Sequence, residues 1–311
     1  MRPGLAALSI DLDALRHYHR IHGLSDPPAS AGPDPVYGKA AARFGELCDR
    51  LGLRGTAFAV GEELAEPGAA VAMAALARAG HEVGNHTFSH DYALTRRPAE
   101  RIALEVRRGA EAIAAVTGAA PVGFRAPGYT LTAPLLAALR DQGYRYDSSA
   151  FPALPYWLAK AAVMGALALR RRPSRAILDR PRALLAPRRP YRPDPAEPYR
   201  RAPAGEGGLV ELPITTGLFG FPLIGTFVAT MPPGLVRALA AGTGRLPLFN
   251  LELHGVDLLD ASDASPALAA RQRDLRVPAK EKLARIEAFV RSLGEREWVT
   301  LEEAAGRFGA G

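Results

Sequence analysis

Short apolar runs rich in β-forming residues alternate with longer amphipathic stretches along most of this chain. The apolar runs predict strands at 5–11, 55–60, 82–86, 122–125, 144–148, 209–215, 248–254 and 298–301. The amphipathic stretches predict helices at 37–51, 69–79, 98–116, 133–142, 233–241 and 278–293. Such alternation is typical of parallel β/α units. We therefore expect an α/β fold, an irregular (β/α) barrel of seven to eight strands.

Ionisable side chains gather at the carboxyl ends of the predicted strands. Five strands end in such residues, which are Asp11, Asp13, His86, His90, Arg125, Asp147 and His254. In a barrel of parallel strands these ends share one face, where the chemistry of such barrels takes place. The pattern thus predicts that residues far apart in the sequence meet in one site.

Two histidines and an aspartate pair form a candidate metal site. His86 and His90 are four residues apart just past a strand, where a tight loop or a helical turn can aim both imidazoles at one point. Two imidazoles and one carboxylate leave positions open for water and substrate, as in hydrolytic metal sites. Asp11 and Asp13 face the same side of an extended chain. One would bind the metal and the other would remain free as a base, and the spacing leaves open which does which.

Five motifs, in this order, resemble those of the polysaccharide deacetylases of the NodB-homology type, also called carbohydrate esterase family four. The motifs are Ser9–Asp13 (SIDLD), His86–His90 (HTFSH), Arg125–Tyr129 (RAPGY), Asp147–Ser149 (DSS) and Leu253–His254 (LH), and the closing Trp298–Glu303 is also similar to the family. The first motif departs from the family's usual adjacent aspartates, because Leu12 separates them. The spaced pair resembles branches that include deformylases of lipid-linked aminosugars, peptidoglycan deacetylases and hydrolases of cyclic imides and amides.

The resemblance implies how the metal and the base would be arranged. Asp13, His86 and His90 would hold a divalent metal, usually zinc, with cobalt, nickel or manganese as alternatives. Asp11 would be the general base that deprotonates the attacking water. The guanidinium of Arg125 would hold Asp11 in place and keep it ionised.

The resemblance also implies a proton donor and a site for the oxyanion. His254 would protonate the leaving nitrogen, and Asp147 would orient the His254 ring. Gly128 and Tyr129 would contact the substrate beside the oxyanion, where the missing Cβ of Gly128 permits close approach of its backbone N–H.

The overall composition fits one folded domain that needs no disulfide. Of the 311 residues, 48% are hydrophobic, which is enough to bury a core and excludes a disordered chain. The single cysteine, Cys48, cannot form an internal disulfide, and no apolar run near the start reaches signal-peptide length. We expect a single domain over residues 1–311, located in the cytoplasm.

The net charge of +7 is concentrated in one segment. Residues 156–203 contain twelve basic and three acidic residues and eight of the 27 prolines, whereas the rest of the chain has 27 basic and 29 acidic residues. We interpret residues 153–208 as a basic, Pro- and Arg-rich insertion. No phosphate-binding glycine loop or nucleic-acid module is present in the sequence, so we expect no nucleic-acid partner.

The insertion begins with an apolar stretch, residues 153–169, which is interrupted by Lys160 and followed by three arginines. It is too short and too polar to span a bilayer. Two interpretations stay open: peripheral association with an anionic membrane surface, or packing against the barrel as a covering helix. Together with a second apolar stretch at 217–228, it indicates a substrate with a lipid part.

Histidines outside the motifs are interpreted as structural or peripheral. His17, His19 and His22 follow the first strand without a carboxylate or cysteine at ligand spacing, so we expect a polar loop at the rim of the site. One of them could contact the substrate there. His81 precedes its strand, so we expect it at the opposite end of the barrel.

The hypothesis that follows is a metal-dependent hydrolase that removes an acetyl or formyl group from the nitrogen of an aminosugar, which is free, polymeric or lipid-linked. One alternative is an amide or cyclic-imide hydrolase with the same site. Another is a protein that retains the metal and binds a glycan or lipid without turnover, although Asp11 and His254 are both present. The acyl group, the native metal and the oligomeric state stay open.

Overall fold

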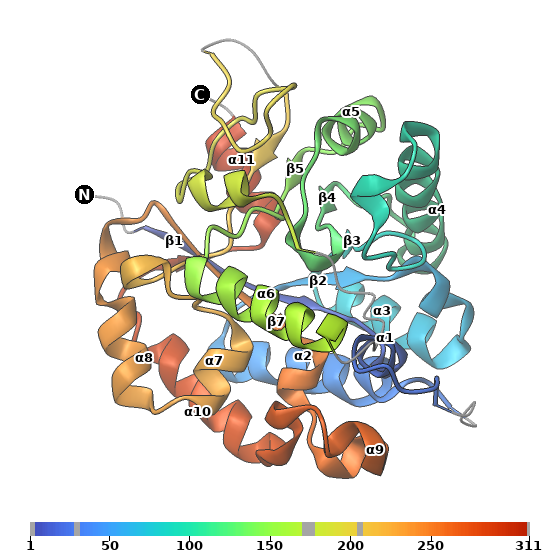
Figure 1. Ribbon diagram of the computed structural model, residues 1–311, viewed down its shortest axis with the longest axis vertical. Coiled ribbons are helices and arrows are strands. Elements are labelled where there is room, and N and C mark those ends of the chain that lie inside the picture. Colours follow the sequence, from blue (N-terminus) through green and yellow to red (C-terminus); the bar gives the residue numbers. More distant parts are fainter. Residues whose placement is uncertain (1–3, 28–31, 170–177, 204–207, 310–311) are drawn as a thin grey trace.

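The fold is a curled parallel sheet surrounded by helices (Figure 1). The computed structural model describes residues 4–27, 32–169, 178–203 and 208–309. The strands within these residues are β1 (Leu5–Asp11), β2 (Thr56–Ala59), β3 (Glu82–Asn85), β4 (Gly123–Phe124), β5 (Tyr146–Asp147), β6 (Val210–Glu211), β7 (Leu248–His254) and β8 (Glu297–Trp298). Their order is β6-β5-β4-β3-β2-β1-β7, with β8 against the start of β1, and the pairings are parallel. The expected (β/α) barrel class is confirmed.

The helices are α1 (Leu15–Ile21), α2 (Ala41–Leu51), α3 (Pro67–Arg78), α4 (Ala99–Thr117), α5 (Ala133–Asp141), α6 (Leu154–Leu169), α7 (Gly225–Thr230), α8 (Pro233–Ala240), α9 (Pro266–Ala269), α10 (Ala279–Arg291) and α11 (Leu301–Gly309). Each of the six predicted helices is present within two residues of its predicted ends, the first as a short π-turn at Val36–Ala40 that continues into α2. Amphipathic periodicity was therefore a reliable signal in this chain.

β1 lies between β2 and β7, and all of its residues are buried. β1 and β7 are in register along their full lengths, from Leu5 beside Leu248 to Asp11 beside His254. This register brings the ends of two distant motifs together at the carboxyl edge of the sheet. Both strands also match their predicted bounds.

The chain that follows β6 continues alongside β7 and brings the two ends of the sheet together. The backbone N–H of Thr215 donates to the Asn250 carbonyl at 3.1 Å. The side-chain amide of Asn250 donates to the Leu212 carbonyl, also at 3.1 Å. The sheet therefore curls toward closure through these bonds, which lie outside the regular strands.

Strands β4, β5 and β6 are only two residues long, although the sequence predicted four to seven residues for each. Pro213 has no N–H and interrupts the ladder of β6. Beyond β5, Ser148 Oγ donates to the Leu212 carbonyl at 2.8 Å, so a side chain replaces a ladder bond. Polar side chains at the strand ends thus shorten the regular strands around the site.

The segment with His17, His19 and His22 was predicted as a loop, and the prediction was wrong: it begins as helix α1. Its first N–H groups are capped from outside, because Leu15 N–H donates to Asp34 Oδ2 at 2.9 Å. Leu15 and Tyr18 are buried in the core. Tertiary packing and a distant cap therefore form a short helix that the local sequence does not indicate.

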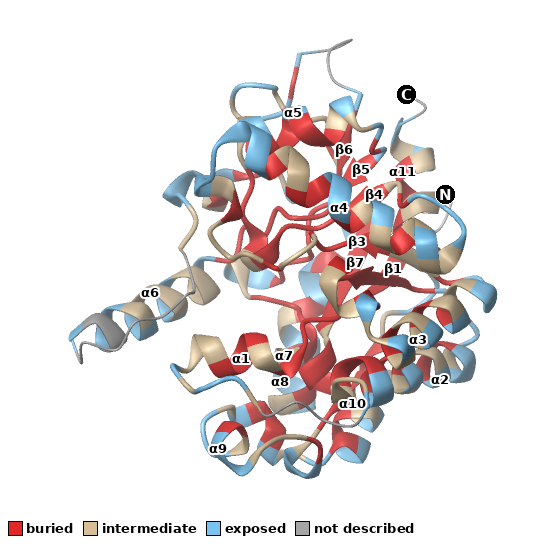
Figure 2. Ribbon diagram, turned by 90° about the vertical axis from the view of Figure 1, so that its right-hand side faces the viewer, coloured by how far each residue is buried: buried red, intermediate tan, exposed pale blue. Residues whose placement is uncertain are grey.

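Helix α6 projects away from the body of the molecule (Figure 2). It carries the apolar start of the predicted insertion, while the four arginines that follow it, at 170–172 and 175, lie outside the described residues. No helix in the described part of the chain has both the length and the apolar character needed to cross a bilayer.

Candidate active site

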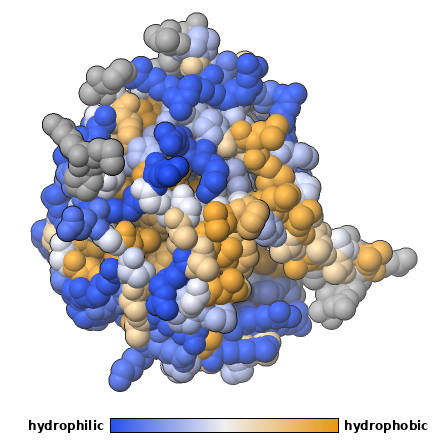
Figure 3. All heavy atoms as spheres, turned by 90° about the vertical axis from the view of Figure 1, so that its left-hand side faces the viewer, coloured by the Kyte–Doolittle hydropathy of each residue, from blue (hydrophilic) through white to orange (hydrophobic). Residues whose placement is uncertain are grey.

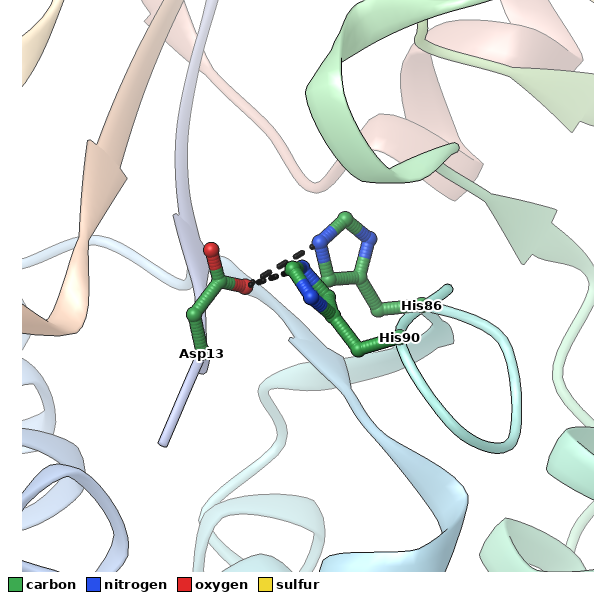
Figure 4. A group of neighbouring side chains, drawn as sticks. All are labelled: Asp13, His86 and His90. Atoms are coloured by element: carbon green, nitrogen blue, oxygen red, sulfur yellow. Dashed lines mark ion pairs between the residues drawn. The ribbon is translucent and has the colours of Figure 1, made fainter. Parts of the chain in front are cut away.

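Asp13, His86 and His90 converge at the carboxyl edge of the sheet (Figure 4). Asp13 Oδ1 lies 3.1 Å from Nε2 of His86 and 3.1 Å from Nε2 of His90. Asp13 follows β1, and His86 is the first residue after β3. All three side chains are buried. Residues from two strand ends thus present three ligand-type atoms to one point.

The His86–His90 loop is held in a constrained backbone conformation. Thr87 and His90 have φ angles of 70° and 53°, in the left-handed region that side chains other than glycine seldom adopt. The Thr87 hydroxyl accepts a hydrogen bond from the His90 N–H at 3.0 Å. Backbone strain of this kind is maintained at functional sites by the surrounding structure. Here it turns both imidazoles toward Asp13.

His86 is oriented through its second ring nitrogen. His86 Nδ1 lies 2.7 Å from the Arg125 carbonyl, which can only accept a hydrogen bond. The proton of a neutral His86 therefore resides on Nδ1, and the lone pair of Nε2 faces Asp13. Ligating histidines are commonly fixed in this way by a backbone carbonyl.

The protonation states of this group suit a metal ligand set. Burial works to raise the pKa of Asp13, but the two imidazoles outweigh it and hold that pKa well below its usual value. Burial lowers the pKa of His90 to about 4, so this ring is neutral at pH 7. Burial works to lower the pKa of His86, but the carboxylates of Asp11 and Asp13 outweigh it and raise that pKa. Within the described residues, Asp13 Oδ1 and His90 Nε2 are both buried without a hydrogen-bond partner. A carboxylate and two imidazoles that converge in this way fit a divalent cation, which would displace any proton on their ligand atoms.

Arg125 holds Asp11 beside this group. Arg125 Nη1 donates to Asp11 Oδ1 at 2.7 Å, while Asp11 Oδ2 lies 3.9 Å from His86 Nε2. The guanidinium is buried, and it also donates to the Ser148 carbonyl at 2.8 Å and to Ser148 Oγ at 2.9 Å. Burial works to lower the pKa of Arg125, but the carboxylates of Asp11 and Glu252 outweigh it and raise that pKa. One oxygen of Asp11 is thus fixed by a permanent charge, and the other faces the candidate metal ligands.

Glu252 is the carboxylate that contacts His254. Glu252 Oε1 lies 3.0 Å from His254 Nδ1, and the Tyr129 hydroxyl lies 3.2 Å from His254 Nε2. Burial works to lower the pKa of His254, but the Glu252 carboxylate outweighs it and raises that pKa well above its usual value. Glu252 is not among the site residues predicted from the sequence. Its spacing from His254 could have indicated it, because residues two apart on one strand place their side chains on the same face.

Asp147 does not take the position that the resemblance implied. It accepts hydrogen bonds from the Ser149 hydroxyl at 2.7 Å and from the Ser149 N–H at 3.2 Å, and it contacts Glu211 rather than His254. Burial followed by the charge of Asp147 raises the pKa of Glu211 well above its usual value. Oε2 of Glu211 has no N–H or O–H donor, so a proton shared between the two carboxyls satisfies it. Asp147 and Glu211 thus form a buried acid pair.

The side chains of Asp11, Glu252 and His254 form a second group that could hold a cation, with ligand atoms within 4.8 Å of one another. Arg125 makes this group less suitable, because its guanidinium already pairs with Asp11. A second positive charge there would be repelled by the buried arginine. The geometry therefore favours Asp13, His86 and His90 as the ligand set.

A cavity of about 460 Å³ opens onto these residues. Asp11, Asp13, His86 and His254 line its floor. Its walls are mainly apolar, and the apolar and aromatic residues that come from α6 and from the segment around the start of α7 are Tyr156, Ala159, Val163, Met164, Ile224 and Phe227. Gly128 and Tyr129, the expected substrate contacts, also line it. The expected site residues other than His90, Arg125 and Asp147 therefore share one cavity.

Tyr129 presents its side chain rather than its N–H to the site. The Tyr129 N–H is used by the Ala126 carbonyl at 3.1 Å. Gly128 and Tyr129 have φ angles of 69° and 63°, so the turn is left-handed at both residues. A side chain at position 128 would be strained whatever space it had.

The remaining histidines have separate roles. His17 is buried and its ring packs against that of His90 at a tilt of 48°, with centroids 4.4 Å apart, while its Nε2 lies 3.3 Å from Glu63 Oε1. His19 Nδ1 contacts the Ser25 carbonyl at 2.7 Å and is structural. His22 lines the cavity and contacts Gln272 at 2.7 Å. Among the three, His22 has the position expected of a substrate contact.

Part of the chain is similar to a known protein family. Residues 32–146 match the model of the family described as polysaccharide deacetylase. The chain is related to the polysaccharide deacetylases. The matched region contains His86, His90 and Arg125, whereas Asp11, Asp13 and His254 lie outside it.

A curated relative and solved structures agree with this relationship. A peptidoglycan deacetylase from Helicobacter pylori is 29% identical over 148 residues, which is 47% of this chain and 49% of that protein. The chain thus spans about half the length of the curated relative it matches. A protein from Mycobacterium smegmatis described as a polysaccharide deacetylase has a TM-score of 0.59 at 17% identity, covering 97% of this chain and 89% of that chain.

A further structure with this fold shows why the site must be examined residue by residue. A variant of a CE4-family pseudoenzyme from Bacillus anthracis, described as having restored activity, has a TM-score of 0.50 at 10% identity. The alignment covers 97% of this chain and 68% of that chain. At such identities the likeness shows the fold alone, and the fold includes proteins without turnover. Activity has to be argued from the side chains.

Proposed function

We propose that the protein is a metal-dependent hydrolase that removes an acetyl or formyl group from the nitrogen of an aminosugar. The observation that carries the proposal is the convergence of Asp13, His86 and His90 beside an aspartate held by Arg125 and a histidine held by Glu252. The similarity of residues 32–146 to the polysaccharide deacetylase family supports deacylation as the reaction. The residues in the cavity supply a base, an acid and ligands for a cation in one place.

Asp13, His86 and His90 would hold the divalent metal. Their mixed nitrogen and oxygen donors suit zinc, and cobalt, nickel or manganese are alternatives with similar ligand preferences. Such an ion, when bound, acts as a Lewis acid toward the amide carbonyl and makes water more acidic. The buried donor atoms without hydrogen-bond partners support this assignment.

Asp11 serves as the general base in this proposal. Its Oδ1 is occupied by Arg125, so Oδ2 is the atom that accepts a proton from the attacking water. The water oxygen forms a bond to the carbonyl carbon of the amide. The ion pair with Arg125 positions the Asp11 carboxylate for that step.

His254 serves as the general acid. Glu252 holds Nδ1, which leaves Nε2 as the atom that donates a proton to the leaving nitrogen. The carbon–nitrogen bond then breaks, and the products are the free amine and acetate or formate. The Tyr129 hydroxyl beside Nε2 helps to position the ring.

The apolar walls of the cavity support a substrate with a lipid part. α6 exposes Leu158 and Val163, and the nearby Leu218 and Phe219 are also exposed. Hydrophobic side chains on the projecting part of the molecule continue onto its body (Figure 3). We therefore favour a lipid-linked aminosugar over a polymer, and a peripheral position of α6 on an anionic membrane surface. A cytoplasmic protein would meet such a substrate at the inner face of the membrane.

Two alternative functions use the same residues. An amide or cyclic-imide hydrolase would need the same base and acid, and the size of the cavity admits such substrates. A protein that binds a glycan or lipid without turnover would retain the ligands alone. The ordered contacts of Asp11 and His254, which such a protein does not need, argue against it.

Metal analysis combined with product release tests the proposal. Wild type, Asp11→Asn and the control Asp141→Asn, which changes an exposed aspartate at the end of α5, are compared. We expect about one metal per chain in all three, and acetate or formate release from N-acylated aminosugars by wild type and the control only. Absence of metal from wild type would overturn the assigned site. Metal without release from any aminosugar would favour the imide, amide or binding alternatives.

A further inference from the structure

Helix α6 places a lysine at the inner end of the cavity wall. Lys160 lines the same cavity as two of the candidate metal ligands, Asp13 and His86, and as the candidate base and acid. Its ammonium Nζ lies 3.5 Å from the Gly128 carbonyl and 5.8 Å from the centre of the Tyr156 ring. These are weak contacts, because 3.5 Å is long for a hydrogen bond to an ammonium group. Most of the donor capacity of Lys160 therefore remains unused.

Lys160 forms no ion pair with any described residue. In the described part of the chain, no carboxylate oxygen lies within 4.0 Å of its Nζ. Burial lowers the pKa of Lys160 to about 8, and the charge of Asp179 offsets part of that effect. The side chain is therefore mostly protonated at pH 7. An ammonium group that is partly withdrawn from water and has no carboxylate in contact among the described residues would be stabilised by a bound anion.

Lys160 is close to the residues assigned to the reaction. A Cβ placed on Gly128 would lie 3.6 Å from Lys160 Nζ. The next residue, Tyr129, reaches Nε2 of His254 with its hydroxyl at 3.2 Å. The ammonium group and the proposed acid thus contact neighbouring residues of the same turn, Lys160 at Gly128 and His254 through the Tyr129 side chain. A group bound to Lys160 would be attached to the sugar itself or directly next to it.

The cavity-facing side of α6 changes from polar to apolar along the helix. Tyr156, Ala159, Lys160, Val163 and Met164 line the cavity, with the spacing of one helix face. Val163 and Met164 follow Lys160 by about one turn, or about 5 Å along the axis. An anion at Lys160 thus has apolar wall on its outer side. This order along the cavity wall matches a substrate in which a sugar is followed by an anionic link and then by an alkyl chain.

We propose that Lys160 binds an anionic group, a phosphate or a carboxylate, that is attached to the acylated aminosugar, with an apolar chain continuing outward past Val163 and Met164. This inference rests on the proposed function and specifies its substrate class. Lys160 is then a specificity-determining residue, and the metal ligands and Asp11 act on the amide beside it. The low polarity of the cavity strengthens the attraction between the ammonium group and the anion.

Four substrates that share one N-acylated hexosamine test the proposal. They carry at the anomeric position a methyl group, an octyl group, a phosphate, or an octyl phosphate. The enzymes are metal-loaded wild type, Lys160→Met, Lys160→Arg and the control Lys280→Met, which changes an exposed lysine on α10. The kcat and KM values are measured for each combination, at one pH near 7 and at two salt concentrations.

We expect Lys160→Met to lower kcat/KM about 10- to 100-fold for the two phosphate-bearing substrates, which is the effect of losing one charged hydrogen bond. The loss should reside mainly in KM, and the neutral substrates should change by less than about threefold. Lys160→Arg should retain most of the preference, because it keeps the charge. The octyl phosphate compound should be the best substrate if the anion comes from a lipid link, and the simple phosphate if it comes from a soluble sugar phosphate.

Two outcomes would overturn the proposal. If Lys160→Met lowered kcat equally on neutral and phosphate-bearing substrates, Lys160 would act on the reacting carbonyl and not on a substrate anion. If the variant left all four values unchanged, Lys160 would bind nothing.

A binding measurement keeps the inference separate from the proposed function. Dissociation constants of octyl phosphate, inorganic phosphate and neutral octyl glucoside are measured by calorimetry with the metal-loaded proteins. Weaker binding of octyl phosphate to Lys160→Met, with the glucoside unchanged, supports the anion site even if no substrate is hydrolysed. Equal binding of octyl phosphate to wild type and Lys160→Met contradicts it, even if deacylation is observed.

Discussion

Glu252 and His254 lie two residues apart on β7 and meet through a contact of 3.0 Å between Oε1 and Nδ1. The carboxylate is fully buried, while the ring reaches the cavity. Because both residues belong to one strand, the pair needs no second element to hold it in register. The proposed acid and the group that sets its pKa are therefore a single structural unit.

Glu252→Gln is expected to shift the alkaline limb of the pH profile of kcat/KM to lower pH. His254 acts in its protonated form, and its raised pKa keeps it protonated well above pH 6.5. Without the carboxylate, burial lowers that pKa, so activity at pH 8 should fall at least about tenfold while activity near pH 6 changes less. Asp147→Asn is the matched control, and it should leave the alkaline limb of the pH profile of kcat/KM unchanged. The reverse result, a shift with Asp147→Asn alone, would restore Asp147 as the partner of His254.

Arg125→Lys is expected to lower kcat about 100-fold while leaving the metal content unchanged. A lysine keeps the charge but cannot reproduce the simultaneous contacts with Asp11, the Ser148 carbonyl and Ser148 Oγ. The base would then be poorly positioned. Steady-state kinetics and elemental analysis check this, with Arg107→Lys on the exposed face of α4 as the control. If Arg125→Lys kept the wild-type kcat, the positive charge alone would be sufficient to position Asp11.

Metal removal is expected to destabilise the wild-type protein and not Asp13→Asn. A ligand that binds only the folded state raises the midpoint of thermal unfolding, so chelation should lower that midpoint by several degrees. Added zinc should reverse the change. Asp13→Asn should show no response to the chelator, whereas Asp11→Asn should respond as wild type does. An equal response of Asp13→Asn would mean that the ion binds elsewhere, for example at Asp11, Glu252 and His254.

Glu211→Gln is expected to stabilise the protein more at high pH than at low pH. The pKa of Glu211 is raised in the folded state, so its proton contributes stability fully below about pH 4, the ordinary range of a glutamate. That contribution is lost as the pH rises through the folded-state pKa. Glutamine keeps a donor toward Asp147 and does not titrate. The free energy of unfolding of the variant, relative to wild type, should therefore rise by about 1–3 kcal/mol between pH 5 and pH 9.

Denaturant unfolding at pH 5, 7 and 9 measures this difference, and Glu295→Gln at an exposed position is the control. A difference that stays constant across the three pH values would show that Glu211 is ionised in the folded protein throughout.

Much of this architecture follows from local sequence patterns. Amphipathic periodicity predicted the long helices, and the largely apolar runs of β1 and β7 predicted both of these seven-residue strands to the residue. The positions at strand ends indicated the candidate site, because the topology of a parallel barrel brings them together. Helix α1 was missed because its stability depends on Asp34 and on packing, neither of which is local.

The partners of individual site residues were harder to predict. Asp147 and Glu252 both lie next to strand ends, and which of them contacts His254 depends on side-chain directions that motif order does not contain. Lys160 was noticed only as an interruption of an apolar stretch. Its position over Gly128 depends on how α6 packs, which involves residues more than thirty positions apart.

The two halves of the cavity come from different kinds of chain segment. Its floor consists of strand ends that are anchored in the sheet, whereas α6 projects from the body and supplies one wall. Mutations at the outer positions of this wall, such as Val163 and Met164, can therefore remodel it while the strand ends that carry the reacting groups stay in place. Substrate preference and catalytic chemistry can then evolve independently, and exchange of residues 154–169 between relatives is a direct route to enzymes with the same reaction and new substrates.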